Sequence, residues 1–168
     1  MEVRVAMALG LVLASAMCGK ALADAVRRRA RTLEALSEGL QTLRIHMTGM
    51  FEPVRNALEH CDCPVMALVA ENMDDGASAD EAWRSVQKRA ARRGGPIDAL
   101  NDGDRQILDH LFAGLGQSGR REQEALLSGT LRAIALRREG ALAKAREADR
   151  LYLPLGILTG LMLALVVI

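Results

Sequence analysis

The stretch that decides the fold is VRRRARTLEALSEGLQTLRIHM, residues 26–47. Its apolar side chains recur at spacings of three, four and seven, at Val26, Leu33, Leu36, Leu40, Leu43 and Met47. Such spacing places them along one side of an α-helix. It therefore predicts a helix over 26–48 with a single packing face, which ends at Gly49 and the Glu52–Pro53 step.

The composition of the whole chain agrees with a helical fold. Half of the 168 residues are hydrophobic, but only 2% are aromatic, and most of the apolar residues are Ala, Leu, Val and Met. Ala, Leu and Met favour helices and strand-preferring aromatic residues are scarce, so the chain is predicted to be all-α. The net charge is only +1, which excludes a protein that binds nucleic acid through excess positive charge.

The C-terminal segment carries no charged residue. Residues 151–168 read LYLPLGILTGLMLALVVI. As a helix these 18 residues span about 27 Å, close to the thickness of the hydrocarbon layer of a membrane. We therefore predict a transmembrane helix over 151–168, with Pro154 in its first turn. Gly156 and Gly160 have the spacing that lets membrane helices approach closely.

The N-terminal segment has two interpretations. Residues 5–19 are uncharged and lie between Arg4 and Lys20, whose charges can reach the interface and lengthen a short span. This predicts a transmembrane anchor within 1–25. The alternative is a signal peptide that is cleaved after Ala23 and releases an exported helical binding protein. Lys20 and the arginines that follow argue against cleavage.

Basic residues gather at both junctions between these segments and the central region. They are Arg27, Arg28, Arg29, Arg31, Lys144, Arg146 and Arg150. Because positive charge favours the cytoplasmic side of a membrane, the central region, 26–150, is predicted to be cytoplasmic, with both termini outside. The arginine cluster is also expected to contact anionic lipid head groups rather than nucleic acid.

The central region contains six predicted helices. They cover 26–48, 53–61, 64–74, 79–93, 102–115 and 119–150. The clearest break is the Gly94–Pro96 step, and the last helix continues into the C-terminal segment. The prediction is a cytoplasmic antiparallel six-helix bundle on two terminal transmembrane helices.

Polar residues mark where several of these helices begin. Ser78 and Glu81 have the spacing of a capping box. Asn101 or Asp102 is expected to cap the fifth helix, and Ser118 the last.

Motifs for catalysis are scarce. The chain has neither GxxxxGK[ST] nor GxGxxG, so it is not predicted to be an NTPase. His60, Cys61 and Cys63 form the only metal-like cluster, and His46 and His110 lie far away in the sequence. The cysteines are interpreted as small packing residues, with no metal or cofactor. A thiol or metal-dependent enzyme that uses His60, Cys61 and Cys63 is a third hypothesis.

Three motifs carry a family resemblance. They are DRQIL at 104–108, LGQSGRREQ at 115–123 and YLPLGILTGL at 152–161. Together with the N-terminal anchor and the length, they resemble the stage III sporulation protein AB family of endospore-forming bacteria. The resemblance covers essentially the whole chain, and its C-terminal third is the specific part. Gly119 stands where the family prefers Asp, which weakens the cap of the last helix.

The resemblance implies a non-enzymatic function. The family is similar to the inner-membrane platform protein, the F component, of type II secretion and type IV pilus systems, whose cytoplasmic six-helix domains lie near a secretion ATPase. It implies a platform subunit of the channel between mother cell and forespore, located in the mother-cell membrane. Its implied partners are the stage III sporulation AA-type ATPase and other membrane proteins of the same operon, and the chain could also form a homo-oligomer.

Partner contact is expected at exposed polar residues near two stretches of the central region. One is the acidic cap around 101–104 and the other is the turn at 114–119. The expected residues are Asp102, Asp104, Gln117, Arg120, Arg121 and Gln123. Arg137 and Arg138 are expected to lie on a solvated helix face.

Overall fold

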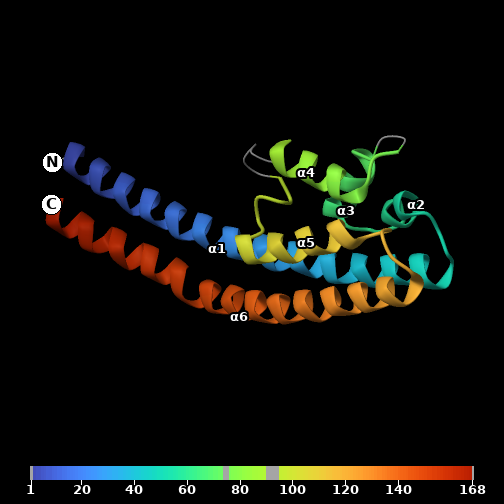
Figure 1. Cartoon of the computed structure of the whole chain (residues 1–168). Coiled ribbons are helices and arrows are strands. Elements are labelled where there is room, and N and C mark those ends of the chain that lie inside the picture. Colours follow the sequence, from blue (N-terminus) through green and yellow to red (C-terminus); the bar gives the residue numbers. More distant parts are fainter. Residues whose placement is uncertain (1, 74–75, 90–94, 168) are drawn as a thin grey trace. The chain divides into compact units, whose positions relative to one another are not determined.

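The computed structural model describes residues 2–73, 76–89 and 95–167, and every regular element in these ranges is a helix (Figure 1). The elements are α1 (Glu2–Arg44), the π-helix η1 (Ile45–Gly49), α2 (Val54–Glu59), α3 (Pro64–Glu71), α4 (Ala79–Arg89), α5 (Asp102–Gly114) and α6 (Arg120–Val167). The all-α prediction is confirmed for this part of the chain. No helix, judged on its described residues, is long and apolar enough to cross a membrane.

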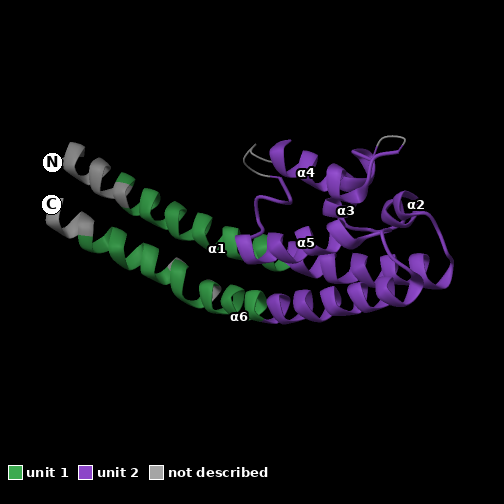
Figure 2. Cartoon of the chain, in the orientation of Figure 1, with its two compact units in different colours: residues 1–30, 140–168 green, residues 31–139 purple. Residues whose placement is uncertain are grey.

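The chain divides into two compact units (Figure 2). Unit 1 comprises residues 1–30 and 140–168, and unit 2 comprises residues 31–139. The long helices α1 and α6 contribute to both units. The predicted division into 1–25, 26–150 and 151–168 stays a prediction.

Within unit 1, α1 and α6 run antiparallel with their backbones in contact. The Ser15 hydroxyl donates a hydrogen bond of 2.5 Å to the carbonyl oxygen of Gly156. A Cβ atom added at Gly160 would lie 2.8 Å from Cα of Val12, and one at Gly19 would lie 2.5 Å from the carbonyl oxygen of Tyr152. Only glycine permits this approach. The close contact predicted from the glycine spacing in α6 is therefore present.

Pro154 lies elsewhere in its helix than predicted. Because α6 begins at Arg120 and runs without a break to Val167, Pro154 is deep inside the helix rather than in a first turn. As predicted, the last helix continues into the apolar C-terminal segment.

The core of unit 2 is built on the leucine stripe. Leu33, Leu36, Leu40 and Leu43 of α1 have no exposed surface, which confirms the predicted packing face. The rings of Trp83 in α4 and Phe112 in α5 lie 5.1 Å apart in the same core.

Side-chain capping marks the start of α4 and α5. Ser78 and Glu81 exchange hydrogen bonds as predicted, at 3.1 and 3.3 Å. For α5 the cap is Asn101, whose side chain accepts from the Asp104 amide at 2.9 Å. The last helix begins at Arg120, so Gly119, and not the predicted Ser118, occupies its N-cap position.

The ends of the short helices differ from the prediction by a few residues. Helix α2 ends at Glu59 and α3 at Glu71, where the predictions extend to 61 and 74. Helix α4 is described to Arg89, and the rest of the predicted 79–93 lies outside the described residues.

Candidate partner-binding site

Two chain reversals of unit 2 meet at one corner. After η1 the chain turns through Met50 and Phe51, and the guanidinium of Arg120 lies 4.9 Å from the centre of the Phe51 ring. The same two reversals also meet at Gly116, where an added Cβ atom would lie 2.9 Å from the side chain of Val54. Gly116 has a φ of +77°, which side chains rarely adopt. We call Ile45, Met50, Phe51 and Arg120 the η1 corner.

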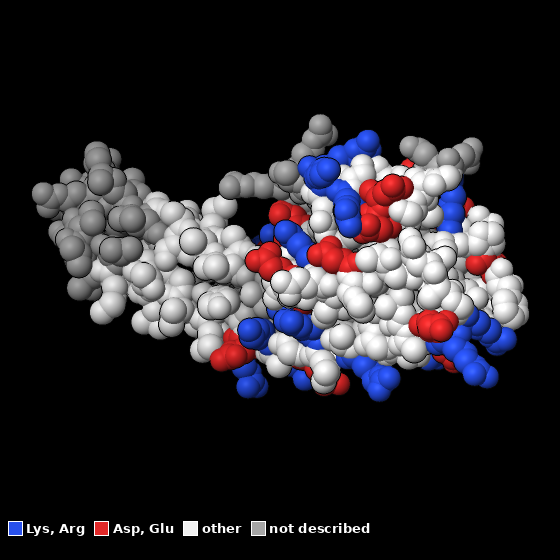
Figure 3. Space-filling view, viewed as in Figure 1, with Lys and Arg blue, Asp and Glu red and all other residues white. Residues whose placement is uncertain are grey.

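The η1 corner presents apolar side chains to solvent. Ile45 is 55% exposed, Met50 59% and Phe51 67%. Phe51 also has a φ of 59°, a left-handed conformation that is rare and strained for a bulky residue. A π-helix and a strained residue next to exposed apolar side chains are typical of sites that contact other molecules. The face of the molecule drawn in Figure 3 carries charges of both signs.

Two residues expected to be exposed are buried, and that expectation is wrong. Asp104 has no exposed surface; its carboxylate accepts from the Asn101 amide at 3.2 Å and lies 4.0 Å from Arg137. Gln123 is only 6% exposed. Its side chain donates to the carbonyl of Gly114 and accepts from the amide of Gly116, so it closes the turn between α5 and α6.

The other four predicted contact residues are exposed. Gln117, Arg120 and Arg121 lie together on the turn before α6 and its first residues. Asp102 lies at the opposite end of α5, roughly 18 Å away along a helix of that length. The structure therefore places Arg120 at the η1 corner, keeps Gln117 and Arg121 close to it along the chain, and leaves Asp102 apart. Their role in partner contact stays a prediction.

Of the arginine pair of α6, Arg137 is exposed as expected and Arg138 is half-buried. Arg138 forms an ion pair of 3.2 Å with Glu34 of α1. Arg137 covers Gly103, where an added Cβ atom would lie 2.7 Å from its guanidinium. Both side chains thus join α6 to other helices of unit 2.

The seven junction residues all lie on α1 or α6. Arg27, Arg28 and Arg29 of α1 and Lys144, Arg146 and Arg150 of α6 belong to unit 1, and Arg31 belongs to unit 2. Arg27 forms an ion pair of 3.3 Å with Asp24.

The two neighbouring cysteines are packed inside unit 2. The thiol of Cys61 donates to the carbonyls of Gly39 and Ala57, at 3.3 and 3.1 Å, and Cys63 is 2% exposed. Burial raises the pKa of Cys61 to about 12 and also raises the pKa of Cys63. Because the thiolate is the reactive form, this site does not suit a thiol nucleophile.

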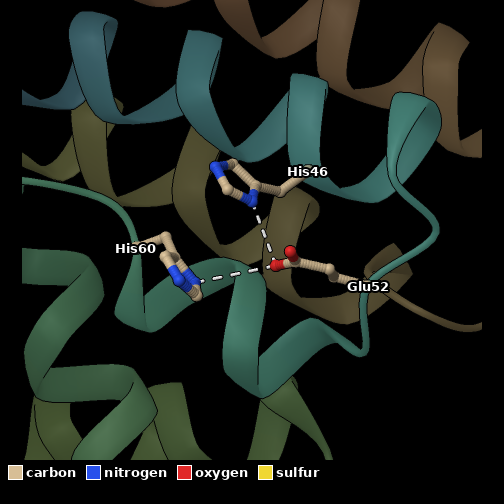
Figure 4. Close-up of side chains that lie close together, drawn as sticks. All are labelled: His46, Glu52 and His60. Carbon is tan, nitrogen blue, oxygen red and sulfur yellow. Dashed lines mark hydrogen bonds and ion pairs between the residues drawn. The ribbon is translucent and has the colours of Figure 1, made fainter.

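One cluster of side chains was missed in the sequence. His46 of η1, Glu52 of the following loop and His60 at the end of α2 point toward one another (Figure 4). Nδ1 of His46 lies 3.0 Å from the Glu52 carboxylate, and Nδ1 of His60 lies 3.6 Å from it. The chain reverses at Gly49–Pro53, and this predicted turn is the sequence feature that indicates proximity of the two histidines.

Comparison with protein-family models matches residues 4–168 to the family described as stage III sporulation protein AB. The match covers both apolar ends as well as the helices between them. Neither a curated protein nor a solved structure matches the chain.

Proposed function

Because the chain belongs to the stage III sporulation protein AB family, which gives it a role in sporulation, we propose that it is a non-enzymatic platform subunit of the channel between mother cell and forespore. In this proposal its ends anchor it in the mother-cell membrane. Its central region faces the cytoplasm, where it docks the stage III sporulation AA-type ATPase, and other membrane proteins of the same operon complete the assembly.

The packing within unit 1 supports the membrane anchor. Helices α1 and α6 meet through glycines, as membrane helices commonly do. Their remaining surface bears exposed apolar side chains, among them Leu13, Met17, Leu155, Leu158, Leu161 and Met162. Exposure of such a surface to water is unfavourable in free energy, whereas contact with lipid chains removes this penalty. The junction arginines and lysines would then lie at the lipid head groups.

The observation that carries the docking proposal is the exposed apolar surface of the η1 corner. Phe51 and Met50 are more than half exposed, and Arg120 stacks on the Phe51 ring. Aromatic residues, methionine and arginine are enriched at the centres of protein interfaces. The strained backbone at Phe51 holds its ring outward. A role in internal packing alone would not require this conformation.

Binding of the purified AA-type ATPase to the full chain in detergent tests this proposal. We expect Phe51→Ala to weaken binding by about tenfold or more, the effect of losing a central interface side chain. Leu136→Ala is the matched control, because Leu136 is 72% exposed on α6 and lies outside the η1 corner. It should bind as the wild type does.

Two results would contradict the proposal in different ways. If the wild-type chain does not bind the ATPase, the docking function is wrong. If it binds and Phe51→Ala and Arg120→Glu bind equally well, the η1 corner is not the docking surface.

A further inference from the structure

We propose that His46, Glu52 and His60 form a binding site for a divalent transition-metal ion of the zinc type. This site is separate from the ATPase-docking function, and either could exist without the other. Nothing in the family description concerns a metal.

The three side chains already converge. One nitrogen of each imidazole and one oxygen of Glu52 lie within 4.8 Å of one another. The two imidazole rings are stacked, with centroids 4.9 Å apart and planes inclined by 17°. Metal–ligand bonds of about 2.0–2.2 Å require the donors to move inward only slightly, by rotation of exposed or half-buried side chains.

The surroundings of His60 resemble those of a metal-binding histidine. Its Nδ1 lies 2.7 Å from the carbonyl oxygen of Asn56. A carbonyl oxygen only accepts, so this contact puts the proton on Nδ1 and leaves a lone pair on Nε2. The same Nδ1 lies 3.6 Å from Glu52, so an ion bound at Nε2 would keep the Asn56 contact, whereas an ion bound at Nδ1 would replace it. Metal ligands are commonly oriented in this way by a backbone carbonyl. The side chain of His60 is 58% exposed, which leaves room for an ion to enter and for water to complete its coordination.

The donor set selects the class of metal. Two imidazole nitrogens and one carboxylate oxygen suit zinc and similar ions, which accept three protein ligands and keep one position open. Magnesium and calcium prefer oxygen ligands alone and would bind poorly. Cys61 and Cys63 are excluded as ligands, because both are buried and the Cys61 thiol is directed at backbone carbonyls.

A bound ion would join three successive segments of the chain. His46 belongs to η1, Glu52 to the loop and His60 to the residue that follows α2. The ion would therefore close the reversal that carries Met50 and Phe51, and it should raise the thermal stability of this part of unit 2.

Zinc titration of the metal-stripped full chain in detergent tests the proposal. We expect a single zinc ion to bind per chain with an affinity in the micromolar range or tighter, and cobalt to give the visible spectrum of a tetrahedral site. Glu52→Gln and His60→Gln should each weaken zinc binding by more than about tenfold, the loss that even changes in the second shell of ligands cause. His110→Gln is the matched control, because His110 lies on α5, outside the cluster.

Several results would overturn the site. The wild-type chain could bind no zinc, both cluster variants could bind zinc as tightly as the wild type, or His110→Gln could lose as much affinity as they do. Circular dichroism of the metal-free variants shows whether each one folds. His60 is exposed and Glu52→Gln preserves the shape of the side chain, so at least one folded variant is expected to decide the outcome.

Discussion

Replacement of Asp104 by alanine should destabilise unit 2 strongly. Asp104 is fully buried at the start of α5, where its carboxylate accepts the amide proton of Asn101 at 3.2 Å. The variant would leave that amide of Asn101 without this acceptor, and it would remove the negative charge 4.0 Å from Arg137. The sequence alone suggests a surface role for Asp104, whereas the structure predicts that it stabilises the fold.

The expected magnitude follows from these contacts. Loss of a capping interaction costs about 0.5–2 kcal/mol, and loss of a hydrogen bond to a charged group costs about 1.5–3 kcal/mol. The ion pair with Arg137 adds little, because the arginine side chain is 45% exposed and therefore screened by water. Because the first two costs overlap, we expect Asp104→Ala to lower the free energy of unfolding by about 2–4 kcal/mol.

Urea unfolding of the full chain, followed by circular dichroism, measures this effect. The matched control is Asp102→Ala, two residues earlier on the same helix, where the side chain is exposed. Asp102 lies in the first turn of α5, where its charge interacts with the helix dipole, so its loss should cost about 0.3–1 kcal/mol. Equal effects of the two variants, or an Asp104→Ala effect below about 0.5 kcal/mol, would refute the structural role of Asp104.

Three further predictions follow from unit 1 and from the buried thiol. Gly160→Ala should lower the melting temperature, because the added Cβ atom would lie 2.8 Å from Val12. The control Gly140→Ala, in open space on the same helix, should raise the melting temperature. Equal shifts in the two variants would contradict the close contact. Cys61 should resist alkylation in the folded chain at pH 8–9 and react after unfolding, since a pKa of about 12 instead of 9.0 lowers the thiolate fraction about a thousandfold. Because the folded chain holds that proton more tightly, the contribution of Cys61 to stability is complete below about pH 9 and is lost as the pH rises to about 12. N-terminal sequencing of the native protein should show that residues 1–23 are retained, since Ser15 and Gly19 contact α6; a mature start at Asp24 would support the exported alternative.

The features that could be predicted from the sequence depend on regular spacing or on short-range chemistry. The leucine stripe of α1 has the period of a helix, so its buried face was evident before any contact was known. The capping box of Ser78 and Glu81 is a local motif, and it forms as expected. The glycines of α6 were recognisable from their spacing, although their contact residues on α1 were not.

The features that could not be predicted depend on tertiary contacts. Asp104 and Gln123 are polar residues at helix starts and would be exposed in isolated helices. In the folded chain both are buried: Asp104 lies 4.0 Å from Arg137 of α6, and Gln123 forms hydrogen bonds with the turn between α5 and α6. The His46–His60 cluster requires the reversal after η1, and the sequence does not show how tightly that turn closes. The role of Phe51 could not be predicted, because nothing in its local sequence indicates a left-handed, outward-facing conformation.

Site-specific photo-crosslinking in sporulating cells tests the central claim most directly. A photoreactive amino acid at position 51 of the full chain replaces the exposed aromatic side chain of the η1 corner, and the same group at position 136 serves as the control. We predict a crosslink to the AA-type ATPase in the membrane fraction from position 51 and none from position 136. Absence of the ATPase from the position 51 adducts, or equal crosslinking from both positions, would contradict the docking account.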